Sequence, residues 1–195
     1  MIAIIDRLLA AVAGRLAGRR VSAWLAGIAE VRITRLPFLP QLWSGRYGQI
    51  DIAVATLSAG GVELRDFHGQ LTDVRAPLRT LLTGTGITAN GVSASASIPL
   101  SVIAARLPAG LELRWQGDEL AVSGIALLMP VFGTLALRPE GQRIVVVPKV
   151  LGVPSLVAFV IPLNGLPPGL TIECLRPGDS TVELIIGGQN IRIGT

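Results

Sequence analysis

The stretch Val31–Leu57, VRITRLPFLPQLWSGRYGQIDIAVATL, joins two alternating segments through a proline-containing connection. Apolar residues occupy every second position before and after this connection, at Val31, Ile33, Ile50, Ile52 and Val54. Such alternation is typical of β-strands that bury one face. Pro37 and Pro40 stiffen the connection because their rings fix φ. The sequence therefore predicts two strands joined by a rigid turn.

The connection itself is apolar, with Phe38, Leu39, Leu42 and Trp43 close together. The whole chain has four phenylalanines and three tryptophans, so two of these residues in one connection is a notable concentration. Connections usually run over the surface of a protein. This cluster is therefore expected either to plug the end of a sheet or to line an opening that contacts a ligand.

The same two-residue period continues along the rest of the chain. It recurs in the segments 62–64, 111–115, 120–122, 135–137, 144–146, 170–174 and 182–186. Glycine, proline and aspartate turns separate many of these segments, which predicts an antiparallel meander. Cys174 continues the alternation of Leu170 and Ile172, so it is expected to be a small buried residue.

The first 28 residues have a helical period instead. Ile5, Leu8, Leu9, Val12 and Leu16 form one stripe. A second stripe, which includes Trp24, has a different phase, and the change falls at Gly18, where glycine weakens a helix. This pattern predicts a kinked amphipathic helix. Shorter helices are predicted at 77–82, 99–106 and 153–163, each near a proline.

Together these elements predict one α+β domain. Residues 1–28 form its amphipathic helical region and residues 29–195 form a long antiparallel sheet with short helices. A sheet of this length rarely stays flat and open. It is therefore expected to curve strongly around the helix and enclose an apolar channel. Two L-P-x-G-L motifs, Leu107–Leu111 and Leu166–Leu170, each precede a hairpin and suggest a duplicated half-unit.

The composition is unusually apolar for such a domain. Hydrophobic residues make up 50% of the chain, charged residues only 15%, and the mean hydropathy is +0.61. The best candidate membrane span is Ile144–Leu163, but it contains Lys149 and three prolines, which helix interiors tolerate badly. The excess of apolar residues is therefore assigned to the channel.

Positive charge concentrates near the N-terminus, where residues 1–50 contain seven arginines against Asp6 and Glu30. This balance suits an anionic surface such as a membrane. Nucleic acid fits less well, because the chain has one lysine, few aromatic residues and no known binding motif. Asp6 and Arg7 interrupt the N-terminal apolar segment, so a clean secretion signal is not recognised. Either the protein stays inside the cell or an upstream leader is missing.

The residues needed for catalysis or metal binding are sparse. His68 is the only histidine and Cys174 the only cysteine, and no G-x-S-x-G elbow, P-loop or dinucleotide fingerprint is present. We therefore expect no enzymatic activity, no cofactor and no metal. A lipid-acting hydrolase that depends on His68 is the least favoured alternative.

Two motifs in the opening stretch resemble a known family. Leu36-Pro37-Phe38-Leu39 followed by Gly45-Arg46-Tyr47 is similar to the LmeA-like phospholipid-binding proteins of actinobacterial envelopes, and the resemblance extends from about Asp6 to Ile193. It implies a tubular lipid-binding fold of the BPI type, with lipid tails in an apolar cavity and no catalysis. It also implies a location in the cell envelope or at a membrane. Relatives usually carry an apolar export or anchor segment before the helix, whereas here only Met1–Ile5 precedes it.

The predicted ligand is thus a phospholipid that the protein binds or transfers. The candidate channel residues are Trp24, Phe38, Leu39, Leu42, Trp43, Ile52, Val54 and Leu64. The candidate headgroup residues are Arg32, Arg35 and Arg46, because the guanidinium fork suits phosphate. The alternative function is a membrane-peripheral scaffold that attaches through its basic N-terminal helix.

Overall fold

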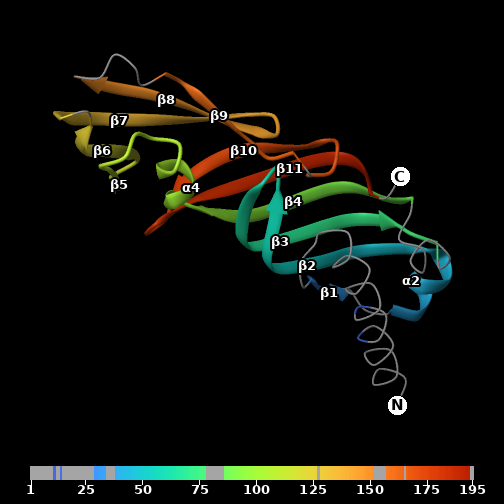
Figure 1. The fold of residues 1–195 in the computed structure, drawn as a ribbon. Coiled ribbons are helices and arrows are strands. Elements are labelled where there is room, and N and C mark those ends of the chain that lie inside the picture. The colour runs from blue at the N-terminus through green and yellow to red at the C-terminus, as the bar shows by residue number, and fades with distance from the viewer. Residues whose placement is uncertain are drawn as a thin grey trace.

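The computed structural model describes residues 29–33, 38–77, 86–126, 128–151, 157–164 and 166–193, together with Ala11 and Gly14. This part of the chain is 71% strand and 10% helix. The strands form two antiparallel sheets of six and five strands (Figure 1).

The six-stranded sheet has the order β1-β2-β3-β4-β11-β10. Its strands are β1 (Ala29–Ile33), β2 (Arg46–Ala59), β3 (Val62–Arg75), β4 (Ile87–Pro99), β11 (Thr181–Ile193) and β10 (Leu170–Pro177). The first four follow one another as predicted for a meander, but β4 then pairs with β11, for example Ala94 with Ile186. Residues distant in sequence therefore complete this sheet.

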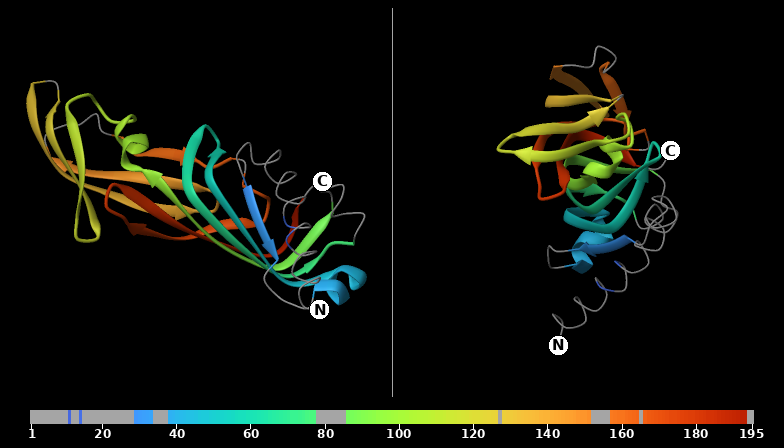
Figure 2. Two further views of the ribbon diagram at one scale, coloured as in Figure 1. Left: turned by 90° about the horizontal axis from the view of Figure 1, so that it is seen from below. Right: turned by 60° about the vertical axis from the view of Figure 1, so that its left-hand side comes forward.

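The five-stranded sheet is a continuous meander. Its strands are β5 (Leu111–Gln116), β6 (Glu119–Ala126), β7 (Met129–Glu140), β8 (Arg143–Leu151) and β9 (Phe159–Pro162). The helix α4 (Leu100–Ala104) connects the two sheets, and α2 (Phe38–Ser44) connects β1 to β2. Figures 1 and 2 show an elongated molecule, with α2 at one end and the β6–β7 hairpin at the other.

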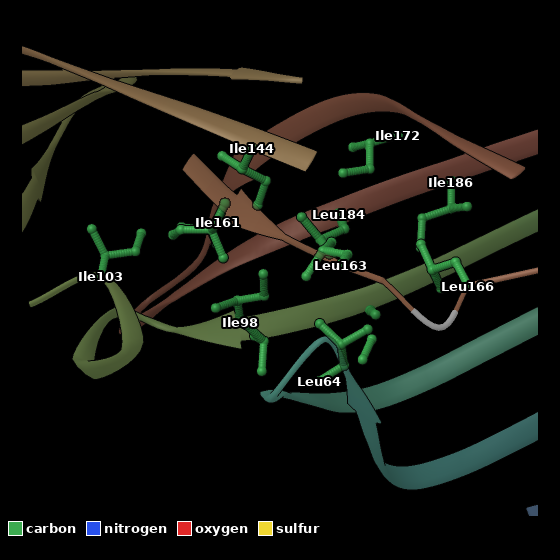
Figure 3. Close-up of a cluster of buried hydrophobic side chains, with 14 of the residues drawn as sticks. Leu64, Ile98, Ile103, Ile144, Ile161, Leu163, Leu166, Ile172, Leu184 and Ile186 are labelled. Atoms are coloured by element: carbon green, nitrogen blue, oxygen red, sulfur yellow. The ribbon is translucent and has the colours of Figure 1, made fainter. Parts of the chain in front are cut away.

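The two sheets share one hydrophobic cluster where they meet. Leu64, Ile98 and Leu184 of the larger sheet lie near Ile144 and Ile161 of the smaller one (Figure 3). Polar contacts hold the same junction. The indole Nε1 of Trp115 donates to the carbonyl of Thr181 at 2.8 Å, and the amide of Ile172 donates to the carbonyl of Gly141 at 2.8 Å.

One face of the six-stranded sheet, here called the inner face, carries its buried side chains. This face bends where Asp66 and Asp73 of β3 adopt positive φ angles of 51° and 49°. Aspartate is among the few residues that tolerate this region. At both positions the alternation slips by one residue on β2 and β3 together, so Tyr47 and Ile50 are both buried on the inner face. The paired slips bend the sheet without exposing its core.

The two L-P-x-G-L motifs have matching geometry. Gly110 and Gly169 both have φ of 91°, in a region that favours glycine. In each motif the following leucine begins a strand and pairs with a glycine of the next strand, Leu111 with Gly124 and Leu170 with Gly188. The repeated sequence therefore corresponds to a repeated structural unit.

The predicted α+β half-barrel is wrong. The structure is mostly antiparallel sheet, its two sheets form no closed barrel, and the described residues include no long N-terminal helix packed on a sheet. The error arose from treating all strands as one curved sheet. The chain instead leaves the first sheet after β4, builds a second sheet, and returns through β10 and β11.

Several local predictions can also be compared with the structure. The predicted helix at 99–106 is present as α4, whereas Phe159–Pro162, in the predicted helix at 153–163, forms β9 because it pairs with β8. Cys174 is exposed, because a register shift between Ile172 and Cys174 turns it away from the core. Most of 1–28 and of 77–82 lies outside the described residues, although Ala11 and Gly14 are helical.

Candidate functional site

A second hydrophobic cluster lies at the α2 end of the six-stranded sheet. Its buried members are Val31, Phe38, Tyr47, Ile50, Leu71, Val74, Ala76 and Ala89. The rings of Phe38 and Tyr47 have centroids 6.3 Å apart at an interplanar angle of 35°, an edge-tilted contact typical of aromatic pairs. Phe38 thus anchors α2 to β2. The apolar connection was expected either to plug the end of a sheet or to line an opening, and Phe38 occupies the position of a plug.

Several hydrogen bonds hold α2 in place against the sheet. The side-chain Oε1 of Gln41 accepts a hydrogen bond from the amide of Gly48 at 3.1 Å. The amide of Ala76 donates to the carbonyl of Gly45 at 2.8 Å. Gly45 ends the helix with φ of 64°, and a Cβ at this position would lie 3.1 Å from Cα of Pro77. Glycine is therefore required both for the conformation and for the close approach.

The other apolar residues of α2 differ in how far they are buried. Leu42 is partly buried against the cluster, whereas Leu39 is 41% exposed and Trp43 is 95% exposed. Leu39 and Trp43 are four residues apart and so share one side of the helix. The connection therefore has a buried side that plugs the sheet and an exposed apolar side.

Between the two hydrophobic clusters, the inner face is incompletely covered. Ile52 and Val92 pack against both clusters but remain partly exposed, as do Gly69 and Gly188. Ile52 pairs with Gly69, and Val92 pairs with Gly188. These four residues, here called the bridging strip, form an apolar surface across four strands in which two positions have no side chain.

A row of arginines crosses the α2 end of the same sheet on the opposite face. Arg46 of β2 pairs with Arg75 of β3, which pairs with Thr88 of β4, which pairs with Arg192 of β11. The neighbouring row on these strands, which includes Tyr47 and Val74, is buried, so the arginine row points outward. All three arginines are exposed. We call Arg46, Arg75 and Arg192 the arginine row.

The outer face of the sheet also has a shallow groove of about 560 Å³. Its side chains are mostly small or polar, among them Asp51, His68, Gln70, Ser93 and Ser95. Gln49 and Gln70 both donate hydrogen bonds to Oδ1 of Asp51, at 3.1 and 3.3 Å. In the part of the chain that the structure describes, no group of three or more histidine, cysteine or acidic residues is arranged to hold a metal ion.

The structure separates the predicted headgroup residues. Arg46 lies in the arginine row, whereas Arg32 forms an ion pair with Glu30 at 2.7 Å beside the outer groove. Arg35 and the predicted channel residue Trp24 lie outside the described residues. The paired position of Arg32 is Asp51, five residues beyond Arg46 on β2 or about 17 Å along the strand, so Arg32 and Arg46 do not share a site.

The remaining predicted channel residues fall into two groups. Phe38, Val54 and Leu64 are at most 2% exposed, so a ligand would contact them only if the clusters opened. Leu39, Leu42, Trp43 and Ile52 are accessible to different degrees. Sequence reasoning did not identify Val92, Arg75 or Arg192. Their positions depend on strand pairing between distant segments, and no local pattern marks them.

Tyr47 carries one unusual polar group. Its hydroxyl is buried, and it has no hydrogen-bond partner in the described part of the chain. Burial raises the pKa of this hydroxyl above its ordinary value, because the phenolate would lose its hydration.

A family model described as LmeA-like phospholipid-binding matches residues 4–186 of the 195 residues. The match therefore includes α2, the five-stranded sheet, and the six-stranded sheet up to Ile186 within β11. It covers Ile52, Gly69 and Val92 of the bridging strip but not Gly188. No curated protein and no solved structure matches the chain. Within the described ranges, none of the helices combines the length and apolar character required to cross a bilayer.

Proposed function

Since the chain belongs to the LmeA-like phospholipid-binding family, we propose that it binds one phospholipid without catalysis, with the acyl chains against the bridging strip. The observation that carries this proposal is the partial exposure of Ile52 and Val92 between two otherwise buried clusters. An acyl chain on this surface would cover apolar area that the protein leaves in contact with water.

The energetics favour acyl chains at this position. Each CH₂ group removed from water contributes on the order of 0.8 kcal/mol. Neighbouring atoms already fill the space beside the two glycines: a Cβ at Gly69 would lie 3.2 Å from the Phe67 ring, and one at Gly188 would lie 2.8 Å from Leu170. The accessible apolar surface of the bridging strip therefore comes from Ile52 and Val92. Ile33, Ile87 and Leu42 are also partly buried apolar residues next to the α2 cluster. They extend the accessible apolar surface from the bridging strip toward α2.

The headgroup in this proposal lies toward Arg46. Ile52 is six residues beyond Arg46 on β2, a distance of about 20 Å in an extended strand. Half the thickness of a bilayer with its headgroups is also about 20 Å, which is the length of one phospholipid. Arg46 points to the outer face, whereas the tails lie on the inner face, so in this proposal the headgroup turns around the α2 end of the sheet, where the guanidinium group binds the phosphate through paired hydrogen bonds.

The proposal includes transfer of the lipid between membranes and a location at the cell envelope or another membrane. A lipid held on an open strip can leave without unfolding of the core, which suits a carrier. The scaffold alternative depends on residues 1–28, most of which lie outside the described part of the chain, and no described contact favours it.

Native mass spectrometry of detergent-free protein tests lipid binding directly. We expect adducts with phospholipid masses. A protein with no adduct that also fails to take up phospholipid from vesicles would contradict the proposal.

The position of the lipid is tested with two adjacent substitutions. Val92→Gln places a polar amide on the bridging strip, whereas Ser93→Gln places the same group on the outer face. We expect Val92→Gln to lower lipid occupancy about tenfold, since burying an unpaired amide costs roughly 1–3 kcal/mol. Ser93→Gln should keep the occupancy of the wild type. A phospholipid with a photoreactive acyl chain should label β2 and β4 near Ile52 and Val92. Labelling confined to the outer groove would show that the lipid binds the outer face of the sheet, which would contradict the proposal.

A further inference from the structure

One side of α2 presents large apolar side chains to the solvent. Trp43 is 95% exposed, although a tryptophan can bury about 150–250 Å² of surface. Leu39, on the same side of the helix, is 41% exposed. The hydrogen bonds of Gly48 with Gln41 and of Ala76 with Gly45 hold the helix that presents them. Two large apolar side chains are therefore displayed on a fixed support.

The arginine row lies at the same end of the sheet, and its like charges do not stabilise the fold. Arg46 and Arg75 are direct cross-strand partners, and like charges in this position are destabilising. Four ion pairs join described residues, and they use Arg32, Arg65, Arg114 and Arg143, each with a glutamate two or three residues away. None of these pairs involves the arginine row. Asp73 is the acidic residue closest to Arg75 along β3.

We propose that the α2 end docks on the surface of an anionic phospholipid bilayer. Trp43 and Leu39 enter the interfacial region, where tryptophan is favoured because its ring is apolar and its indole N–H is polar. The arginine row binds lipid phosphates. Neighbouring strands are about 4.8 Å apart, so the row from Arg46 to Arg192 extends over about 14 Å. It can therefore contact more than one headgroup.

The opposite end of the molecule provides an internal comparison. Ile125, Leu128 and Phe132 of the β6–β7 hairpin are 63%, 97% and 64% exposed. The sequence between Leu120 and Leu137 contains no charged residue. This end is at least as apolar as α2 but has no charge that matches an anionic surface. Leu128 is therefore a matched control for Trp43, because both side chains are almost fully exposed.

The docking proposal does not depend on where a bound lipid lies. It concerns the surface of the bilayer, whereas the proposed function concerns a single lipid on the bridging strip. Adducts seen by native mass spectrometry test the second, and association with vesicles tests the first. Wild-type protein without adducts that still floats with anionic vesicles would remove the proposed function and leave the docking proposal in place.

The experiment is flotation of the full chain with vesicles of phosphatidylcholine, with and without phosphatidylglycerol. We expect wild-type protein to bind the vesicles that contain phosphatidylglycerol. Trp43→Ser should weaken this binding about tenfold or more, the effect of returning one large apolar side chain to water. Leu128→Ser should bind like wild type. Thermal unfolding of both variants checks that they are folded.

Three results would overturn the proposal. The first is that Trp43→Ser binds as well as wild type. The second is that Leu128→Ser loses as much binding as Trp43→Ser. The third is equal binding of wild type to vesicles with and without phosphatidylglycerol, since the arginine row would then have no role.

Discussion

The two ends of this elongated protein both display apolar side chains, but they differ in the charge of the residues around those side chains. At the α2 end, Trp43 is accompanied by the arginine row. At the hairpin end, Leu128 and Phe132 lie in a segment without charge. Exposure alone therefore does not identify a partner. The charges beside the exposed residues distinguish an anionic membrane surface from other apolar partners, and this difference can be tested from either end.

The largest effect is expected from removing the charge at the α2 end. Arg75→Gln combined with Arg192→Gln should weaken binding to anionic vesicles about 30-fold, because each basic residue near such a surface contributes about 1 kcal/mol. Vesicle titration measures this change. High salt should weaken the binding of the wild type in the same way, since the Debye length falls to about 3 Å at 1 M.

The matched control removes two arginines from the five-stranded sheet. Arg114 and Arg143 pair with Glu112 and Glu140 at 2.9 and 3.2 Å, so their charges are already compensated. Arg114→Gln with Arg143→Gln should leave vesicle binding unchanged. An equal loss in both double variants would mean that net charge, and not the position of the arginine row, determines binding.

A smaller effect is expected from glycine substitutions at the two ends. Leu128 has φ of 65°, a conformation that costs a non-glycine residue about 1–2 kcal/mol. Leu128→Gly should therefore raise the free energy of unfolding by about 0.5–1 kcal/mol and the Tm by about 1–4 °C. Leu39→Gly should lower stability by about 1 kcal/mol, because Leu39 is helical. Calorimetry that finds both variants destabilised would show that the hairpin turn is not strained.

The smallest effect concerns Tyr47 beneath α2. Tyr47→Phe should be neutral or stabilising by up to about 1 kcal/mol near pH 7, since it removes a buried hydroxyl without a described partner. The pKa of Tyr47 is raised by burial, so the folded protein resists losing this proton. In the unfolded chain the hydroxyl ionises near its ordinary pKa of about 10, whereas the folded protein keeps it protonated. The stability of the wild type is therefore unaffected by this group below about pH 10 and falls as the pH rises above it. Wild type should therefore lose more stability than Tyr47→Phe between pH 9 and about 11. Parallel curves for the two proteins would contradict this assignment.

The sequence predicts local features of this fold well. The alternation at Ile50, Ile52 and Val54 correctly places these residues on one face of a strand, because the period of side chains in a strand is fixed. The prediction for Cys174 is wrong because one register shift reverses the face, and no residue type in that segment marks the shift. The number of sheets is not predictable either, since it depends on whether β4 pairs with β5 or with β11.

The candidate site was only partly predictable for the same reason. The apolar connection with Phe38 and Trp43 is evident in the sequence, but the sequence does not say which side of α2 is buried. Arg46 was identified because it follows this connection. Arg75 and Arg192 come next to it only through strand pairing, so they become visible as part of one row after the sheet is assembled.

The pairing of β4 with β11 also constrains the order in which the protein folds. Ala94 can pair with Ile186 only after the ribosome has synthesised the intervening segment, which contains all five strands of the second sheet. During synthesis, β4 therefore waits with an unpaired edge, which is a site for aggregation. The long loop that must close makes this step slow compared with hairpin formation. A chaperone that protects the nascent chain would be most useful in the interval between the emergence of β4 and that of β11.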